Sequence, residues 1–439
     1  MSAARAKRNA NDDCMKKHFS FMAGASILAA LTGCGVHISG LSGGWSDADL
    51  KAVTNVVQTA TIPAGLKDLD VNNRFGAIHI TGADHETFGW TWKLAIRAAS
   101  DAVAQQIASE SRCQAELDGD HLNLVVSLPD SKEPHSIQSD FEIRVPKSAS
   151  VHAQNRFGRI EIADLTDDVE ARDENGGLEI SNIGGSVRAR TSFNTLSVSN
   201  TGPATLKNQN GKIEATGIGG TLAATTSFAS LLARDIRGPA ALTNQNGEIQ
   251  VAAVGGSLSA KTSFNSLVAS DIGGPVRLRN QNGSIKIVQV RGDAEIETSF
   301  NLLSVEGIQG DAILKNQNGG ITANGIIGSL EASTSFAAME VTGAGSKFAC
   351  HNQNGAIRLR ATSVTLTNIE AKTSFNTLEV RLPASLKPAI QAHTTFAEVE
   401  SDFPVLMKPR GEDPFAEVAP DTARISLQNQ NGKISILHD

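Results

Sequence analysis

The sequence predicts an all-β protein, a parallel β-helix built from coils of about 18 residues, with a small α+β cap near its N-terminus. Three observations predict this fold. An apolar residue recurs every 18 positions, the residue three positions before it alternates between Phe and Asn, and Gly-Gly or Gly-Pro pairs interrupt each unit. A fixed period near 20 indicates a chain that stacks one small unit on itself.

The apolar ladder runs for about two hundred residues. Its members are Ile160, Leu178, Leu196, Ile213, Leu231, Ile249, Leu267, Ile285, Leu303, Ile321, Met339 and Ile357. The residues three positions earlier are Phe157, Asn175, Phe193, Asn210, Phe228, Asn246, Phe264, Asn282, Phe300, Asn318, Phe336 and Asn354. The full repeat is therefore 36 residues long and contains a Phe coil and an Asn coil.

Each coil reads as short strands joined by corners. With the Phe or Asn position taken as zero, apolar residues recur at −6, −4, +3, +5 and +8. Pairs two apart indicate strands with one buried face, and the breaks in this step indicate corners. Eighteen residues are too few for a β-α-β unit, so a β-helix coil fits best.

The alternation of coils also predicts how the interior packs. Phe coils carry a large residue at −6 and usually Ala at −4, as Leu258 and Ala260 do, and Asn coils reverse this order. Large over small fills a narrow core. We expect the Phe ring to lie over the space beside Ala, and the Asn amide at the same corner to bond the turn backbone. Phe193→Ala or Phe264→Ala should then lower stability by about 3–5 kcal/mol.

Residues 1–33 are predicted to be a lipoprotein signal peptide. A basic stretch begins at Met15, an apolar run follows from Phe19 to Leu31, and Leu31-Thr32-Gly33-Cys34 resembles the lipobox of bacterial lipoproteins. The run is too short to span a bilayer. Translation starts at Met1 or Met15, and an uncleaved cytosolic tail is the alternative interpretation.

The resemblance implies cleavage before Cys34 and lipidation of its thiol. Several acyl chains would anchor the protein stably to a membrane, since one chain alone is marginal. Gly35 follows Cys34 where an Asp would retain a lipoprotein at the inner membrane, so the outer membrane is favoured, on its periplasmic or its outer side.

The other segments divide as follows. Residues 34–70 read as a tether and first strand, and residues 71–150 as a first coil with the α+β cap. Within the cap, residues 98–115 are predicted to form an amphipathic helix between strands. Residues 151–381 form the regular β-helix, and residues 382–439 form irregular C-terminal coils whose capping the sequence leaves open.

Composition excludes several classes of protein. From Cys34 onward the net charge is near −10, because the first 33 residues hold five of the 39 basic and two of the 46 acidic residues. This argues against a nucleic-acid partner. Cys113 and Cys350 have no Cys-x-x-Cys partner and are expected to be buried, and no His spacing indicates a metal. No cofactor is expected.

No set of residues points to catalysis. Outward acids are scattered, and Asp235 and Asp271, which share a column, are two coils or about 10 Å apart. Both read as turn residues. Arg291-Gly292-Asp293 spells the integrin-binding tripeptide but occupies a corner where other coils have Gly-Gly. The protein is therefore not expected to be an enzyme.

A basic strip is the one candidate binding surface. Position −3 carries Arg190, Lys207, Lys261, Arg279, Lys315 and Lys372 in one outward column, and Thr or Asn at −2 is expected to run beside it near the corner. Such a strip could hold an anionic polysaccharide or lipid head groups. The alternative is a solvated face whose charges prevent aggregation.

The repeated Phe/Asn-Gly-x-Ile/Leu-x-Val units, such as Asn210-Gly211-Lys212-Ile213-Glu214-Ala215, resemble bacterial β-strand-repeat domains of unknown function often labelled "putative adhesins". The resemblance covers most of residues 70–439. It implies a right-handed β-helix in the cell envelope and brings no catalytic residues.

The function we expect is thus a non-catalytic, lipid-anchored envelope protein, adhesin-like or a structural scaffold. The alternative is a binding module for an anionic glycan or an envelope protein, and a polysaccharide-degrading enzyme is less favoured. An exposed aromatic row would favour glycan binding, whereas ladders of Thr and Asn alone would favour a scaffold.

Overall fold

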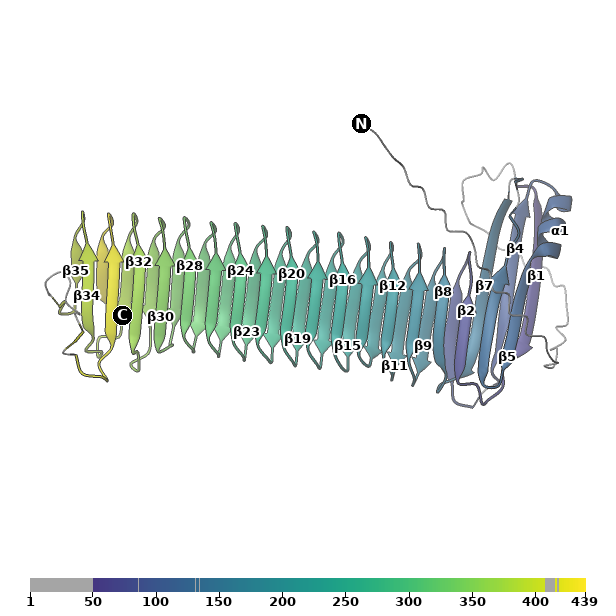
Figure 1. Cartoon of the computed structure of the whole chain (residues 1–439), viewed down its shortest axis with the longest axis horizontal. Helices are drawn as coiled ribbons and strands as arrows, with labels where there is room; N and C mark the ends of the chain where they lie inside the picture. The colour runs from purple at the N-terminus through teal and green to yellow at the C-terminus, as the bar shows by residue number, and fades with distance from the viewer. Residues whose placement is uncertain (1–49, 86, 131, 134, 407–414, 417) are drawn as a thin grey trace, which may run out of the picture.

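The computed structural model describes residues 50–85, 87–130, 132–133, 135–406, 415–416 and 418–439. They form a rod in which two sheets face each other and each coil gives one strand to each sheet (Figure 1). Neighbouring strands along the rod are parallel and 17 or 18 residues apart in sequence, as Ala204 is from Val187 and Ala240 from Leu222. The predicted parallel β-solenoid is therefore confirmed. Within the described residues, no helix has the length and apolarity needed to cross a bilayer.

The strands of the regular stack are five or six residues long. Sheet B contains β8 (Ser150–Asn155), β10 (Val169–Asp173), β12 (Val187–Thr191), β14 (Ala204–Asn208), β16 (Leu222–Thr226), β18 (Ala240–Asn244), β20 (Leu258–Thr262), β22 (Val276–Asn280), β24 (Ala294–Thr298), β26 (Ala312–Asn316), β28 (Leu330–Thr334), β30 (Lys347–Asn352) and β32 (Asn368–Thr373). Sheet A contains β9 (Ile160–Leu165), β11 (Leu178–Ile183), β13 (Leu196–Thr201), β15 (Ile213–Ile218), β17 (Leu231–Ile236), β19 (Ile249–Val254), β21 (Leu267–Ile272), β23 (Ile285–Val290), β25 (Leu303–Ile308), β27 (Ile321–Ile326), β29 (Met339–Gly343), β31 (Ile357–Ala361) and β33 (Leu378–Leu382).

The core between the sheets follows the predicted large-over-small order. Leu258 lies in register with Ala240 of the preceding coil, and Ala260 with Leu242. All four side chains are at most 3% exposed. Alternating volumes therefore fill the narrow interior without a void, as close packing requires.

A ladder of left-handed residues explains the irregular step from +5 to +8. One residue at +7 in successive coils has a positive φ between 53° and 72°. The ladder consists of Asp164, Asn182, Asn200, Gly217, Asp235, Ala253, Asp271, Gln289, Gly307 and Gly325. Gly, Asn and Asp adopt this conformation most readily. Each one breaks the alternation of the strand, so that the apolar residue at +8 turns inward.

The corner between sheet B and sheet A is held by a buried polar ladder at −2. Its members are Asn155, Asp173, Thr191, Asn208, Thr226, Asn244, Thr262, Asn280, Thr298, Asn316, Thr334, Asn352, Thr373 and Asn429, all at most 7% exposed. With the exception of Asp173, each side chain donates to the backbone of the preceding coil, as Asn280 Nδ2 does to the Asn265 carbonyl at 2.6 Å and Thr262 Oγ1 to the Gly247 carbonyl at 2.9 Å. The prediction of an outward Thr and Asn column was wrong, because position −2 continues the inward alternation of the strand.

The N-terminal end of the rod adds antiparallel strands and one helix. In sheet A, β1 (Ala52–Thr61), β4 (Gly89–Ala98), β7 (His135–Pro146) and β3 (Ile78–Ala83) lead to β9; in sheet B, β5 (Arg112–Asp118), β6 (His121–Ser127) and β2 (Asp68–Asn72) lead to β8. Helix α1 (Asp101–Glu110) packs on β1 and β4 at the outer end (Figure 1). The helix is shorter than the predicted 98–115, because the chain from Arg112 pairs with β6 as a strand.

The C-terminal coils stack out of chain order. Strands β34 (Ala389–Thr394) and β35 (Val399–Ser401) form the outermost coil, although β36 (Arg424–Asn429) and β37 (Ile434–His438) follow them in sequence. The later pair inserts between β32–β33 and β34–β35. In space, the Asn431 coil therefore lies between the Phe375 and Phe396 coils, and the alternation of Phe and Asn coils continues.

Candidate binding strip

The Phe side chains at position zero point into solvent, which corrects the predicted packing over Ala. The Phe row consists of Phe157, Phe193, Phe228, Phe264, Phe300, Phe336, Phe375 and Phe396, and these residues are between 41% and 76% exposed. The turn begins at −1, so position zero lies at its tip, beyond the inward alternation of the strand. The predicted large loss of stability on removing Phe193 or Phe264 is consequently wrong for the folded structure.

The position-zero Asn side chains are also less important for the turn than predicted. Asn282 Nδ2 makes one hydrogen bond of 3.2 Å to the Ser263 carbonyl, whereas Asn280 makes three. In Asn coils the −2 Asn holds the turn, because its Oδ1 accepts from the Gly at +1 while its Nδ2 reaches the preceding coil.

Amide side chains lie between the Phe residues. In Asn coils the residue at −1 is Gln, and all six of these are exposed: Gln209, Gln245, Gln281, Gln317, Gln353 and Gln430. None of them has a side-chain hydrogen bond to another residue in the described part of the chain. This edge therefore alternates an aromatic ring with a free amide. We call the Phe row and these Gln residues the edge strip.

A hollow lies at the N-terminal end of the edge strip. The ring of Phe75 stacks on that of Phe157 with 5.4 Å between centroids and 10° between planes. The two rings, together with Gln138, Asp140 and Arg159 among others, line a space of about 590 Å³. Burial raises the pKa of Asp140 from its ordinary value. The hollow thus joins an aromatic floor to polar and ionisable groups.

The six predicted basic residues fall in one column on the outer face of sheet B, three positions before the tip of the turn. Arg190 is in register with Lys207, and Lys261 with Arg279. Arg279 lies 3.5 Å from Glu297 and 3.7 Å from Glu295, so its charge is partly compensated. Arg190, Lys207, Lys261 and Lys372 form no salt bridge with any residue that the structure describes. Cys34, the predicted lipidation site, lies outside the described residues.

The column continues to Arg172, which the prediction did not include. Arg172 is in register with Arg190, so three like charges stand side by side with Lys207. Like charges directly opposite each other in a sheet are destabilising. Glu170 pairs with Arg172 and relieves part of this repulsion.

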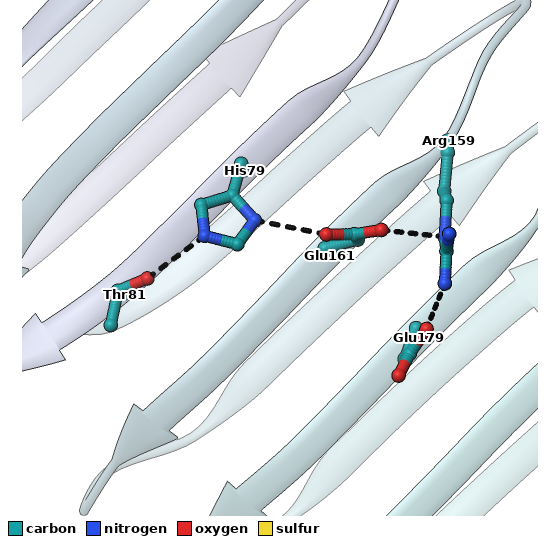
Figure 2. A network of polar contacts seen from close by, with 5 residues as sticks. All are labelled: His79, Thr81, Arg159, Glu161 and Glu179. Atoms are coloured by element: carbon teal, nitrogen blue, oxygen red, sulfur yellow. Dashed lines mark hydrogen bonds and ion pairs between the residues drawn. The ribbon is translucent and has the colours of Figure 1, made fainter.

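The outer face of sheet A carries a different network. Glu161 joins His79 of β3, at 3.0 Å from Nδ1, to Arg159, at 2.7 Å from Nε, and Arg159 also pairs with Glu179 (Figure 2). The remaining nitrogen of His79 lies 3.2 Å from Thr81 Oγ1. Each polar end in this network has a partner, and the network lies on a flat strand surface, so it reads as a link across neighbouring coils.

The other groups considered from the sequence are structural in form. Asp235 and Asp271 occupy the left-handed ladder, with φ of 55° and 57°. Asp293 of the Arg-Gly-Asp tripeptide accepts a hydrogen bond from the Asp311 amide at 2.9 Å, which links two turns. Cys113 and Cys350 are buried, and burial raises the pKa of both thiols to about 12. The described residues contain no group of three metal-ligating side chains.

Comparison with known proteins adds little to this geometry. No protein-family model matches the sequence, and no curated protein sequence does. Two solved structures align over 88% of the chain: a "putative cell adhesion protein" from Clostridium sporogenes, at 10% identity, 100% coverage of that chain and a TM-score of 0.16, and a "putative adhesin" from Bacteroides fragilis, at 13% identity, 97% coverage and a TM-score of 0.17. The likeness is too distant to carry an argument about function.

Proposed function

We propose that the protein is a non-catalytic, adhesin-like rod of the bacterial cell envelope, anchored by acyl chains on Cys34, which binds a ligand along its edge strip. The observation that carries this proposal is the exposed Phe row. Eight large apolar side chains in one line along a rod form an extended apolar surface, and surfaces of this kind commonly mark binding sites.

A purely structural scaffold explains the Phe row less well. The buried Asn and Thr ladder already holds the corner, and the core is filled by residues of the two sheets. An exposed Phe at every second turn tip adds little to either. A polar residue there would serve solubility better. A ligand that covers the rings gives them a role.

An enzyme is the least favoured function. A glycan-cleaving site needs two carboxyl groups facing each other within a cleft. In the described residues, the acids of sheet A are paired with Arg or His, and Asp235 and Asp271 face the turns. The protein therefore binds its ligand and leaves it unchanged.

The test is retention on bacterial envelope material. The purified protein and a Phe228/Phe264/Phe300→Ser variant are passed over immobilised cell-wall and surface-polysaccharide extracts. A matched variant, Ile313→Ser with Ile327→Ser, removes exposed apolar residues away from the edge strip. The proposal expects retention of the wild type and the matched variant and loss of the Phe variant. Equal behaviour of all three proteins contradicts it.

The anchor has a separate test. Cells given an alkyne-labelled fatty acid should label the wild type and leave a Cys34→Ala variant unlabelled, and the labelled protein should fractionate with the outer membrane. Label that persists in the variant, or a protein found only in the soluble fraction, contradicts anchoring at this residue.

A further inference from the structure

The edge strip has a repeat length. Phe residues occur in every second coil, and parallel strands lie about 4.8 Å apart, so successive Phe positions are about 9.6 Å apart. A disaccharide in an extended β-1,4-linked glycan has a similar length and presents the same sugar face at each repeat. The apolar C–H face of a sugar ring stacks on an aromatic ring, which buries apolar surface on both. One disaccharide per two coils would therefore place a sugar over each Phe.

The residues between the rings suit the polar part of a sugar. Gln245, Gln281 and Gln317 stand at the tips between Phe228, Phe264, Phe300 and Phe336, and their amides are without partners in the described chain. A primary amide offers two donors and one acceptor oxygen. Hydroxyl and N-acetyl groups of the intervening sugar can use both kinds.

The basic column gives the sign of the ligand charge. The protein as a whole carries −7, yet Lys207, Lys261, Arg279 and Lys315 run parallel to the Phe row on sheet B. On the opposite face, sheet A presents acids such as Glu161 and Glu179 at its outward positions. Positive charge is thus concentrated beside the edge strip, where it attracts an anionic ligand.

We infer that the edge strip and its basic column bind a linear anionic polysaccharide with a disaccharide repeat, one repeat for each pair of coils. Sugar rings lie on the Phe residues, and the acid groups face the Lys and Arg side chains of sheet B. A straight line of equal sites along the rod fits an extended polymer, whereas a lipid surface would present separate head groups. The inference rests on the proposed function and adds the chemistry and register of the ligand.

The experiment uses defined oligosaccharides of alternating glucuronate and N-acetylglucosamine, four, eight and twelve sugars long. Neutral N-acetylglucosamine oligomers of the same lengths serve as controls. Calorimetry should give an affinity for the acidic series that rises at least about tenfold from four to twelve sugars, because each added disaccharide reaches another site. The neutral series should bind at least about tenfold more weakly.

Three variants separate the contributions. A Lys207/Lys261/Arg279→Ser variant should lose about tenfold in affinity for the acidic series, lose most of its salt dependence and keep its affinity for the neutral series. The Phe228/Phe264/Phe300→Ser variant should lose both, and Phe→Trp at the same positions should restore binding, which separates stacking from folding. Unchanged circular dichroism confirms that each variant is folded.

Several results would overturn the inference. These are equal affinity for acidic and neutral oligomers, affinity independent of length, an unchanged basic variant, or binding to anionic lipid vesicles in place of both series. Failure of the inference differs from failure of the proposed function. In the first case envelope extracts still retain the wild type and release the Phe variant, and in the second they do not discriminate between the two.

Discussion

Removing one buried amide from the corner ladder should destabilise the rod far more than removing an exposed Phe ring. Asn280→Ala deletes three hydrogen bonds: Nδ2 to the Asn265 carbonyl at 2.6 Å, Nδ2 to the Ser284 carbonyl at 3.2 Å, and the Gly283 amide to Oδ1 at 3.0 Å. Asn280 is 2% exposed, so the groups left behind gain no water. At about 1 kcal/mol for each bond, with an added penalty for orphaned groups, the loss is about 3–5 kcal/mol.

The two comparison variants should change stability much less. Phe264 is 59% exposed, and its replacement by Ala should alter stability by less than about 0.5 kcal/mol. Asn282→Ala is the matched control, since it removes the same amide two residues away and one bond of 3.2 Å. We expect it to cost no more than about 1 kcal/mol.

Urea unfolding and hydrogen exchange measure these differences. A long stack need not unfold in one step, so exchange of the amides in β22 and β23 gives the local opening free energy that bulk unfolding averages. The reasoning is refuted if Phe264→Ala lowers either quantity as much as Asn280→Ala, because the ring would then be part of the core.

Three further predictions follow from the ladder and the core. Asp173 stands where other coils have Asn or Thr; its Oδ2 has no partner, and burial raises its pKa to about 6. The folded state therefore holds this proton more tightly than the unfolded chain, so stability falls as pH rises from about 4 to about 6, by up to about 3 kcal/mol; Asp173→Asn should remove this dependence in urea titrations, and an unchanged pH profile would contradict the assignment. Cys113 and Cys350, whose thiols have a pKa raised to about 12, should react with maleimide at pH 8 only after unfolding, and rapid native labelling of either would show that it is accessible. Deleting residues 256–291, two coils, should preserve the unfolding midpoint, whereas deleting residues 256–273 brings Leu242 against Leu278 and should lower stability by about 1–3 kcal/mol; equal midpoints would argue against the large-over-small rule.

Much of the fold could be predicted because the periodicity records burial directly. The residues at −6, −4, +3, +5 and +8 are apolar since they fill the space between two sheets, so the coil, its strands and its Gly corners follow from the sequence. The stacking of β36–β37 inside β34–β35 could not be predicted, because the 18-residue step is lost between residues 382 and 420, and nothing in chain order reveals an insertion.

The candidate site was harder to predict, for a geometric reason. A Phe in a strand-rich repeat suggests burial, and position zero has the same parity as the inward residues at −4 and −6. The corner turns the chain before that position, so Phe264 points outward while Thr262 is the last inward residue. The sequence contained one usable signal: the −2 position is always small and polar, which is typical of a buried hydrogen-bonded corner. The basic column was visible because it lies within a regular strand.

The most direct test of the binding account places a reporter on the edge strip. Phe264→Trp puts an exposed indole in the Phe row, and Ile327→Trp puts one beside a Gly turn at the opposite edge, where the native residue is also 59% exposed. On addition of envelope polysaccharide, the account predicts a blue-shifted, less quenchable emission for Phe264→Trp and none for Ile327→Trp. An equal response at both positions, or no response at position 264 while the extract still retains the protein, would contradict it.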